Sequence, residues 1–255
     1  MAQMAQMDEE TQQAYTGQLA ERREEILGRM DAALDRAGRP RSAAELVAVS
    51  KTVGVDEVVC AVQVGYRTFA ENRPQELCAK LDGLKAREGL PELRFDMIGN
   101  LQKNKINMVL GRAELIHSIS SLLLAEAVSQ RAERRMDAGE MPGPQPVLLE
   151  VNVSGEESKS GFSPDELRAC MESMQGLRGI SIRGLMTMAP QGDKAVARAC
   201  FSDLRDLRDE LSASSGLELP ELSCGMSEDF EEALEEGSTM VRLGRVVFDP
   251  SFEVR

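Results

Sequence analysis

A lysine at the end of an apolar run is the residue with the clearest chemical potential in this sequence. Lys51 follows the run Leu46-Val47-Ala48-Val49-Ser50, which has the length and composition of a β-strand. Because side chains alternate between the faces of a strand, Lys51 shares a face with Val47 and Val49. If that face points into a core, burial lowers the pKa of the amine and yields a neutral nucleophile that can attack an aldehyde. The alternative is that Lys51 marks the point where the strand meets solvent.

Two segments near the C-terminus have the features of an anion-binding site. The first, Gly225-Met226-Ser227, ends in a hydroxyl at the expected start of a helix, where free backbone N–H groups favour a negative charge. The second, Arg242-Leu243-Gly244-Arg245, offers a glycine that lets backbone amides approach closely and two arginines that can supply positive charge. Together they predict a phosphate cradle.

A simpler interpretation of the same segments stays open. Ser227 is then an ordinary helix N-cap and Gly244 an ordinary strand-end glycine. The neighbouring carboxylates of Glu228 and Asp229 favour this interpretation. No G-x-G-x-x-G or P-loop pattern occurs in the chain, so the sequence gives little support for a nucleotide phosphate.

Eight short apolar runs alternate with helical stretches along most of the chain. The runs are Leu46–Ser50, Thr68–Ala70, Leu93–Ile98, Leu115–Ile119, Val147–Val153, Ile180–Met186, Leu222–Gly225 and Met240–Leu243. Strands that alternate with helices imply parallel pairing and right-handed crossovers. Eight such units favour an α/β fold, a single closed (β/α)8 TIM barrel. An open sheet of seven or nine strands is the alternative, because Thr68–Ala70 is a weak strand.

The beginning of the chain is expected to lie outside this repeat. Residues 9–37 predict a charged N-terminal helix that Gly38 and Pro40 end. Residues 1–8 are expected to form a disordered leader, and residues 9–255 a single domain. Within that domain, Ser163-Pro164-Asp165-Glu166 is a capping box, which indicates the start of another helix.

The predicted barrel brings further polar segments to one end, because functional residues of this fold follow the carboxyl-terminal ends of its strands. A lysine amine near a phosphate cradle suggests an aldehyde that carries a phosphate, and pyridoxal 5′-phosphate (PLP) fits that description. The other polar segments at these strand ends are Glu71-Asn72, Gly99-Asn100-Leu101-Gln102, His117-Ser118 and Asn152-Val153-Ser154-Gly155.

Composition excludes several other classes of function. A net charge of −13 over 255 residues argues against a nucleic acid or an anionic membrane as partner, and no apolar run is long enough to span a membrane. The five cysteines are widely spaced and form no C-x-x-C pair, which is typical of reduced thiols in a cytoplasmic protein. His117 is the single histidine, so a multi-histidine metal site is excluded and a Ser-His-Asp triad is a poor candidate.

The order of the motifs resembles the YggS/PROSC family of PLP-binding proteins, known as pyridoxal phosphate homeostasis proteins. The similarity runs from about Leu46 to Phe248. The motifs that carry it are Val47-Ala48-Val49-Ser50-Lys51-Thr52, Phe69-Ala70-Glu71-Asn72-Arg73, Ile98-Gly99-Asn100-Leu101-Gln102-Lys103-Asn104-Lys105, Ile116-His117-Ser118, Val151-Asn152-Val153-Ser154-Gly155, Ile182-Arg183-Gly184-Leu185-Met186-Thr187-Met188-Ala189-Pro190, Leu222-Ser223-Cys224-Gly225-Met226-Ser227 and Gly237-Ser238-Thr239-Met240-Val241-Arg242-Leu243-Gly244.

The resemblance implies a fold-type III PLP barrel similar to that of alanine racemase without its C-terminal β-domain. Lys51 would hold the cofactor as an internal aldimine, and Ser227 and the Gly244 loop would hold its phosphate. Arg242 would face the pyridine nitrogen, and because an arginine does not readily give up a proton, that nitrogen would stay unprotonated. The remaining cofactor-binding candidates are Asn72, Met226 and Arg245.

Three positions depart from the family pattern. Asp96 stands where a histidine is common, and Cys224 replaces the usual methionine. Asp249-Pro250 replaces a glycine. These departures leave the rim of the pocket and the closure of the C-terminus uncertain, but not the lysine or the phosphate loops.

The same resemblance predicts a carrier in preference to an enzyme. Racemisation needs a second acid/base opposite the lysine, which in alanine racemase is a tyrosine from the domain that is missing here. Tyr15 and Tyr66 do not follow the end of a predicted strand, and His117 is as compatible with a structural role as with a catalytic one. We therefore expect a monomeric protein that buffers PLP, delivers it to PLP-free enzymes and maintains vitamin B6 and amino-acid homeostasis. A PLP enzyme such as a weak amino-acid racemase is the alternative, and a metal- or flavin-using barrel enzyme is disfavoured by the single histidine.

Overall fold

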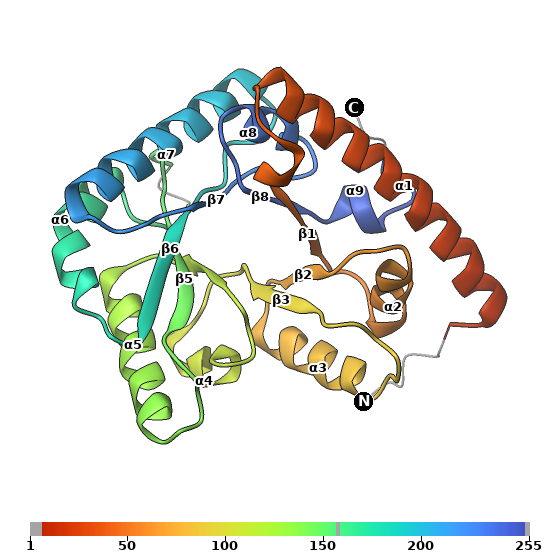
Figure 1. Ribbon diagram of the computed structural model, residues 1–255, viewed down its shortest axis with the longest axis horizontal. Helices are drawn as coiled ribbons and strands as arrows, with labels where there is room; N and C mark the ends of the chain where they lie inside the picture. The colour runs from red at the N-terminus through yellow and green to blue at the C-terminus, as the bar shows by residue number, and fades with distance from the viewer. Residues whose placement is uncertain (1–6, 157–158, 253–255) are drawn as a thin grey trace.

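Eight parallel strands form a closed barrel at the centre of the computed structural model, which describes residues 7–156 and 159–252. Each strand pairs with the next, and β8 pairs back with β1 through Val47↔Arg242 and Ala48↔Leu243 (Figure 1). This confirms the predicted TIM barrel and excludes the open sheets. Strands β1 to β8 are, in order, Glu45–Val49, Thr68–Glu71, Arg94–Met97, Ile116–Ile119, Gln145–Glu150, Ile180–Met186, Glu221–Ser223 and Met240–Leu243.

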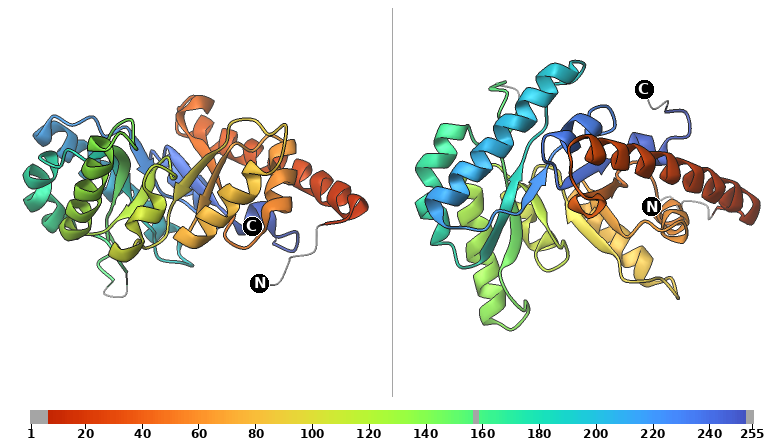
Figure 2. Two further views of the ribbon diagram at one scale, coloured as in Figure 1. Left: turned by 90° about the horizontal axis from the view of Figure 1, so that it is seen from below. Right: turned by 45° about the horizontal axis from the view of Figure 1, so that its top comes forward.

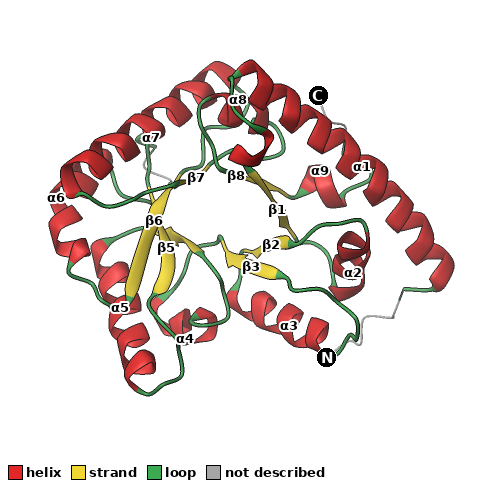
Figure 3. Ribbon diagram, viewed as in Figure 1, coloured by secondary structure: helices red, strands yellow, loops and turns green. Residues whose placement is uncertain are grey.

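The helices form an outer ring around the strands (Figure 3). At least one helical segment follows each strand, and the β3 connection contains a 3-10 turn, η2, ahead of α4. The helices are α1 Glu9–Arg36, η1 Arg41–Ala43, α2 Val55–Gln63, α3 Pro74–Lys85, η2 Lys103–Lys105, α4 Ile106–Val109, α5 Leu122–Asp137, α6 Pro164–Gln175, α7 Lys194–Ser215, α8 Phe230–Glu235 and α9 Arg245–Phe248. No helix in the described ranges combines the length and apolar character needed to cross a bilayer.

The long N-terminal helix α1 lies outside the regular repeat and agrees with the helix predicted over residues 9–37. It packs against α2, α8 and α9, and Figure 2 shows it from two further directions as a separate rod beside the barrel. The Asp8 side chain caps its first turn by accepting the Thr11 N–H at 2.8 Å. The Met7 N–H donates to Asp56 at 3.1 Å, so Met7 and Asp8, at the end of the expected leader, are tied to the fold. Residues 1–6 of that leader lie outside the described residues.

Local signals account for the placement of several outer helices. The predicted capping box at the start of α6 is present, with the Glu166 N–H donating to Ser163 Oγ at 3.2 Å and the Ser163 N–H donating to Glu166 at 2.8 Å. Helix α7 buries a stripe that includes Phe201, Leu204 and Leu207. These side chains cover β6 and neighbouring helices, which places the long connection on the outside of the barrel.

Strand alternation divides the buried residues into two regions. The layer between barrel and helices is aliphatic and aromatic, and includes the stacked pair Phe69 and Phe95. Inward-facing apolar side chains form a smaller cluster: Val47, Val49, Ala70, Leu115, Leu148, Met186 and Met240. Two residues after members of this cluster, and therefore on the same face, come the buried polar residues His117, Glu150 and Arg242. The barrel interior is thus part apolar and part charged.

Candidate functional site

Lys51 lies in the turn directly after β1, at the carboxyl-terminal mouth of the barrel. Val47 and Val49 face the barrel interior, as the alternation predicts. Lys51 itself is exposed, because the strand ends before it and the chain turns toward α2. Of the two interpretations of Lys51, the structure agrees with the one in which the strand meets solvent at this residue, and the amine is not buried among aliphatic side chains. Its position at the mouth nevertheless makes the amine accessible to a ligand.

A buried ion pair fixes the backbone immediately before Lys51. Lys80, on α3, forms an ion pair with Glu71 at the end of β2, and both side chains are almost fully enclosed. The Lys80 ammonium also donates to the Ser50 carbonyl oxygen at 2.6 Å, and the Ser50 hydroxyl donates to Glu71 at 2.6 Å. Glu71 Oε2 is buried and has no hydrogen-bond partner among the described residues. This cluster holds the residue that precedes Lys51 by its carbonyl and its hydroxyl.

Gly244 lies beside Val49 at the end of β1, two residues before Lys51. A Cβ built on Gly244 would lie 3.4 Å from both Cβ and the carbonyl oxygen of Val49, so the loop after β8 already contacts the strand that leads to the lysine. The pairing of β8 with β1 causes this proximity. The predicted cradle and the predicted lysine therefore come from neighbouring strands.

Ser227 joins the second cradle loop to the first. Its hydroxyl oxygen accepts the Val246 N–H at 3.3 Å, which links the loop after β7 to the first turn of α9. Ser227 does not cap α8, because the N-cap residue of that helix is Asp229; the expected helix start at Ser227 is wrong. Gly225 makes this turn possible, since its φ is +92° and a Cβ there would lie 2.6 Å from Ala233 Cβ. The two segments predicted as a cradle are adjacent.

Arg242 points into the barrel beneath the mouth and is 5% exposed. Its Nη1 donates to Ser223 Oγ at 2.5 Å and its Nη2 to the Thr187 carbonyl at 3.0 Å. Burial lowers the pKa of the guanidinium, whereas Asp229 and Glu150 act in the opposite direction. Burial in turn raises the pKa of Glu150, and Arg242 opposes that shift. A cation is thus held in a fixed orientation inside the barrel.

The other three predicted cofactor-binding residues, Asn72, Met226 and Arg245, differ in how they are placed relative to the mouth. The Asn72 backbone packs under Gly99, where a Cβ would lie 2.0 Å from the Asn72 carbonyl oxygen, so Asn72 is at the mouth. The Met226 N–H donates to the buried Asp229 carboxylate at 2.6 Å and is therefore engaged within its own turn. Arg245 donates to Glu228 at 2.6 Å, which draws its side chain toward the surface.

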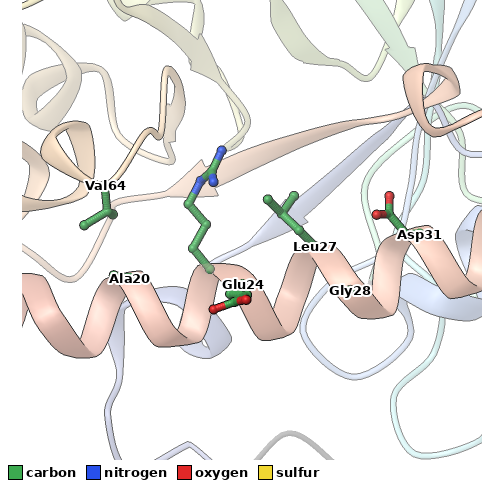
Figure 4. A pocket seen from close by; sticks show the side chains of 7 residues that line it. Ala20, Glu24, Leu27, Gly28, Asp31 and Val64 are labelled. Carbon is green, nitrogen blue, oxygen red and sulfur yellow. The ribbon is translucent and has the colours of Figure 1, made fainter.

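One hollow on the described surface lies away from the mouth. It measures about 520 Å³ and is open to solvent. Its lining residues, shown in Figure 4, are Ala20, Arg23, Glu24, Leu27, Gly28, Asp31 and Val64. Helix α2 begins at the barrel mouth, and Val64 follows its last turn, so this hollow lies toward the opposite end of the barrel. It brings together none of the strand-end residues described above.

Comparison with known proteins agrees with the fold. Residues 26–251 match the family model described as alanine racemase, N-terminal domain. The pyridoxal phosphate homeostasis protein of Aquifex aeolicus is 39% identical over 229 residues, which cover 89% of this chain and 96% of the relative.

The chain belongs to the pyridoxal phosphate homeostasis protein family.

Solved structures extend the comparison to three dimensions. PipY of Synechococcus elongatus, solved with PLP bound, is 33% identical to this homeostasis-family chain. The two structures match with a TM-score of 0.76, and the match covers 90% of this chain and 99% of PipY. Alanine racemase from Corynebacterium glutamicum shares the fold, with a TM-score of 0.64 and 16% identity over 90% of this chain and 63% of the racemase.

Two of the three positions expected to depart from the family pattern, Cys224 and Asp96, lie away from the rim of the mouth. Cys224 faces the outer layer, where burial raises the pKa of its thiol to about 11. Asp96 lies inside the barrel and is fully buried. Asp249 accepts the Ser251 hydroxyl at 2.6 Å, and this hydrogen bond lowers its pKa. The C-terminal segment continues to Phe252, whose carbonyl accepts from Arg22 on α1 at 2.9 Å.

Sequence reasoning missed the residues that support the site from behind. Ser223, Lys80 and Thr187 contact Arg242 or the backbone before Lys51. Ser223 lies within a predicted strand and Lys80 on a helix, and Thr187, although it follows a predicted strand, acts through its backbone carbonyl, which no side-chain pattern indicates. One feature of Lys80 indicates a buried partner: it lies among the buried positions of α3, where a lysine without a counter-charge would destabilise the fold.

Proposed function

We propose that this protein binds PLP at the mouth of the barrel and carries and buffers it, as part of vitamin B6 and amino-acid homeostasis. One observation carries the proposal: Gly244 approaches Val49, two residues before Lys51, and the segment after Gly244 is joined to Ser227 by the Val246–Ser227 hydrogen bond. An amine, a hydroxyl and close backbone N–H groups are the complement of an aldehyde that bears a phosphate. The PLP-bound structure of PipY supports the assignment.

Each residue has a distinct task in this proposal. Lys51 provides the amine to which the cofactor is attached through its aldehyde. Ser227 and the backbone of the Gly244 loop hold the phosphate. Arg242 faces the ring nitrogen and, as a group that keeps its protons, leaves that nitrogen unprotonated. Bound PLP supplies an electrophilic aldehyde and an electron-withdrawing ring, and the pairing with arginine weakens the second property.

The remaining cofactor-binding candidates contribute through their positions in the loops. Asn72 borders the mouth beside Gly99. Met226 shapes the turn that presents Ser227, because its N–H is held by Asp229. Arg245 contributes its backbone to the cradle, since its side chain is paired with Glu228.

A carrier is favoured over an enzyme because no second acid/base is evident opposite Lys51 among residues 7–156 and 159–252. Tyr15 donates to the Phe248 carbonyl at 3.1 Å, outside the barrel, and Tyr66 is buried in the outer layer ahead of β2. Burial raises the pKa of both phenols, so they stay protonated at neutral pH and are not available as bases. His117 is enclosed in the barrel and hydrogen-bonded on both ring nitrogens. The relatives are named homeostasis proteins, which is compatible with a cytoplasmic, monomeric carrier that delivers PLP to PLP-free enzymes.

Two measurements test this proposal. PLP added to the purified protein should produce a stoichiometric change in its visible absorption, and the loaded protein should restore the activity of a PLP-free enzyme. Amino acids incubated with the loaded protein in D2O should keep the proton at Cα. Deuterium incorporation that Lys51→Ala abolishes would contradict the carrier and favour a weak racemase, whereas absence of PLP binding would contradict both.

A further inference from the structure

A continuous chain of hydrogen-bonded side chains crosses the barrel interior below the mouth. Arg94 donates from Nε and Nη2 to Asp96 at 3.0 and 3.1 Å. The two nitrogens of His117 lie 3.1 Å from Asp96 Oδ2 and 2.9 Å from Ser223 Oγ. Ser223 accepts from Arg242 at 2.5 Å. We call these five residues the interior chain; it connects β3, β4, β7 and β8.

The chemistry of the groups fixes the direction of each hydrogen bond. An ionised Asp96 only accepts, so the nitrogen of His117 that faces it, Nε2, carries the proton. Neutral His117 then has an acceptor at Nδ1, which receives the Ser223 hydroxyl proton. The lone pairs of Ser223 remain for Arg242, which only donates. Every donor along the interior chain therefore meets an acceptor.

The surroundings of His117 favour the neutral form that this direction requires. Burial lowers its pKa; Asp96 opposes this shift, and the cations Arg242 and Arg94 add to it. Protonation would also place a hydrogen on Nδ1 and leave the Ser223 proton without its acceptor. Glu150 and Asp229, the carboxylates near Arg242, are not among the hydrogen-bond partners of the ring.

We propose that Asp96 is a positioning residue for the ring end of the cofactor. Through His117 and Ser223 it fixes the Nη1 edge of Arg242, while the Thr187 carbonyl fixes Nη2, so the guanidinium is held at both edges. This inference rests on the proposed function and adds a specific role for a residue at which this chain departs from its family. Asp96 supplies the carboxylate of the interior chain, and Arg94, at the end of that chain, forms an ion pair with it.

The direction of the hydrogen bonds is testable without any cofactor. His117 is the only histidine, so tag-free protein labelled with 15N-histidine gives one imidazole spectrum. Wild type should show the Nε2–H tautomer and should not titrate through the ordinary histidine pKa of about 6.5. In Asp96→Asn, whose amide both donates and accepts, a measurable Nδ1–H population should appear. An Nδ1–H tautomer or an ordinary titration in wild type would overturn the inference.

The effect on the cofactor is tested with Ser223→Ala and Asp96→Asn. Each should weaken PLP binding about tenfold and shift the absorption maximum of the bound cofactor, because each loosens one edge of Arg242. The double variant should lose no more than the larger single effect, since both act through one connection. In each variant the affinity for pyridoxal, which lacks the phosphate, should fall by the same factor as the affinity for PLP, because the interior chain acts on the ring.

The control is Ser129→Ala, which removes a hydroxyl that is 1% exposed and accepts the Gly179 N–H at 2.9 Å in the outer layer. It should leave PLP affinity and the spectrum unchanged. Equal losses in the control and the interior variants, or no change in either interior variant, would overturn the positioning role. If wild type bound no PLP, the proposed function and this role would both fail, and the NMR measurement would still decide the direction of the hydrogen bonds.

Discussion

The barrel interior and the layer between barrel and helices are built from different chemistry. The outer layer is apolar nearly throughout, with aliphatic side chains from every part of the fold. The interior mixes seven apolar side chains with Asp96, His117, Glu150, Ser223 and Arg242. We therefore assign stability chiefly to the outer layer, and we propose that the interior and mouth recognise the cofactor. Glu71 and Lys80, a charged pair in the outer layer, depart from this division directly behind Lys51.

The largest loss of stability should come from breaking that pair. In Lys80→Met the Glu71 carboxylate is left buried without its cation, and the free energy of unfolding should fall by about 3–5 kcal/mol. Urea denaturation measures the change. The double variant Glu71→Leu/Lys80→Met should recover most of it, because no charge remains buried. Arg168→Met, which breaks the exposed pair with Glu210, is the control and should have no measurable effect; equal stability of Lys80→Met and wild type would contradict the assignment.

A deletion in the apolar layer should cost stability without touching recognition. Leu204 on α7 is fully buried, so Leu204→Ala should lower the free energy of unfolding by about 2–5 kcal/mol. The folded fraction should bind PLP with wild-type affinity. Leu123, which is 64% exposed, provides the matched control Leu123→Ala, and its stability should stay close to wild type. A selective loss of PLP affinity in Leu204→Ala would show that the two regions are not separate.

A substitution at the mouth should show the reverse pattern. Ser227→Ala should weaken PLP binding by about 1–3 kcal/mol, the scale of a hydrogen bond to a charged group, with little change in unfolding. The loss should be absent for pyridoxal, because only the phosphate engages the cradle. Isothermal titration with both ligands measures the difference, and equal losses for the two would place Ser227 elsewhere in the site.

The buried His117 inside the barrel should make the free energy of unfolding depend on pH. Burial lowers the folded-state pKa of His117 below its ordinary value of 6.5. The unfolded chain therefore takes up a proton there as the pH falls below about 6.5, and the folded chain only at lower pH. The contribution of neutral His117 to the free energy of unfolding is fully present above about pH 6.5. It is lost as the pH falls below that value, by at most about 1.4 kcal/mol per pH unit for one proton.

Comparison with His117→Gln isolates this contribution. Burial raises the pKa values of Glu150 and Asp229, so these carboxyl groups increase stability as the pH falls. Because they do so in both proteins, their contribution cancels when the two unfolding free energies are subtracted. Denaturation at several pH values should show a shallower loss in the variant. The same slope in both proteins would mean that His117 gains a proton as readily when folded as when unfolded.

The fold was largely predictable from the sequence because its signals are local. All eight predicted strands occur, and β6 and β8 have the predicted bounds. The same locality explains the predicted N-terminal helix and the capping box of α6. Each of these features depends on the order of side chains within a few turns or within one strand.

The site was predictable only in part, because it depends on contacts between distant residues. Alternation placed Val47 and Val49 inside the barrel but did not show that the strand ends before Lys51, which is exposed. A serine followed by two carboxylates predicted a helix start at Ser227, whereas the helix begins later and the hydroxyl meets Val246. The bond between His117 and Ser223 joins residues 106 positions apart, and no local pattern indicates it.

We propose that Lys51 is the residue to which PLP is covalently attached. The most direct test is to load the protein with PLP, reduce it with borohydride and locate the added mass by peptide mapping, with Lys51→Ala treated in the same way. We predict a single adduct on the peptide that contains Lys51, and no adduct in the variant. An adduct on another lysine such as Lys103 or Lys159, or an unchanged yield in Lys51→Ala, would contradict the account.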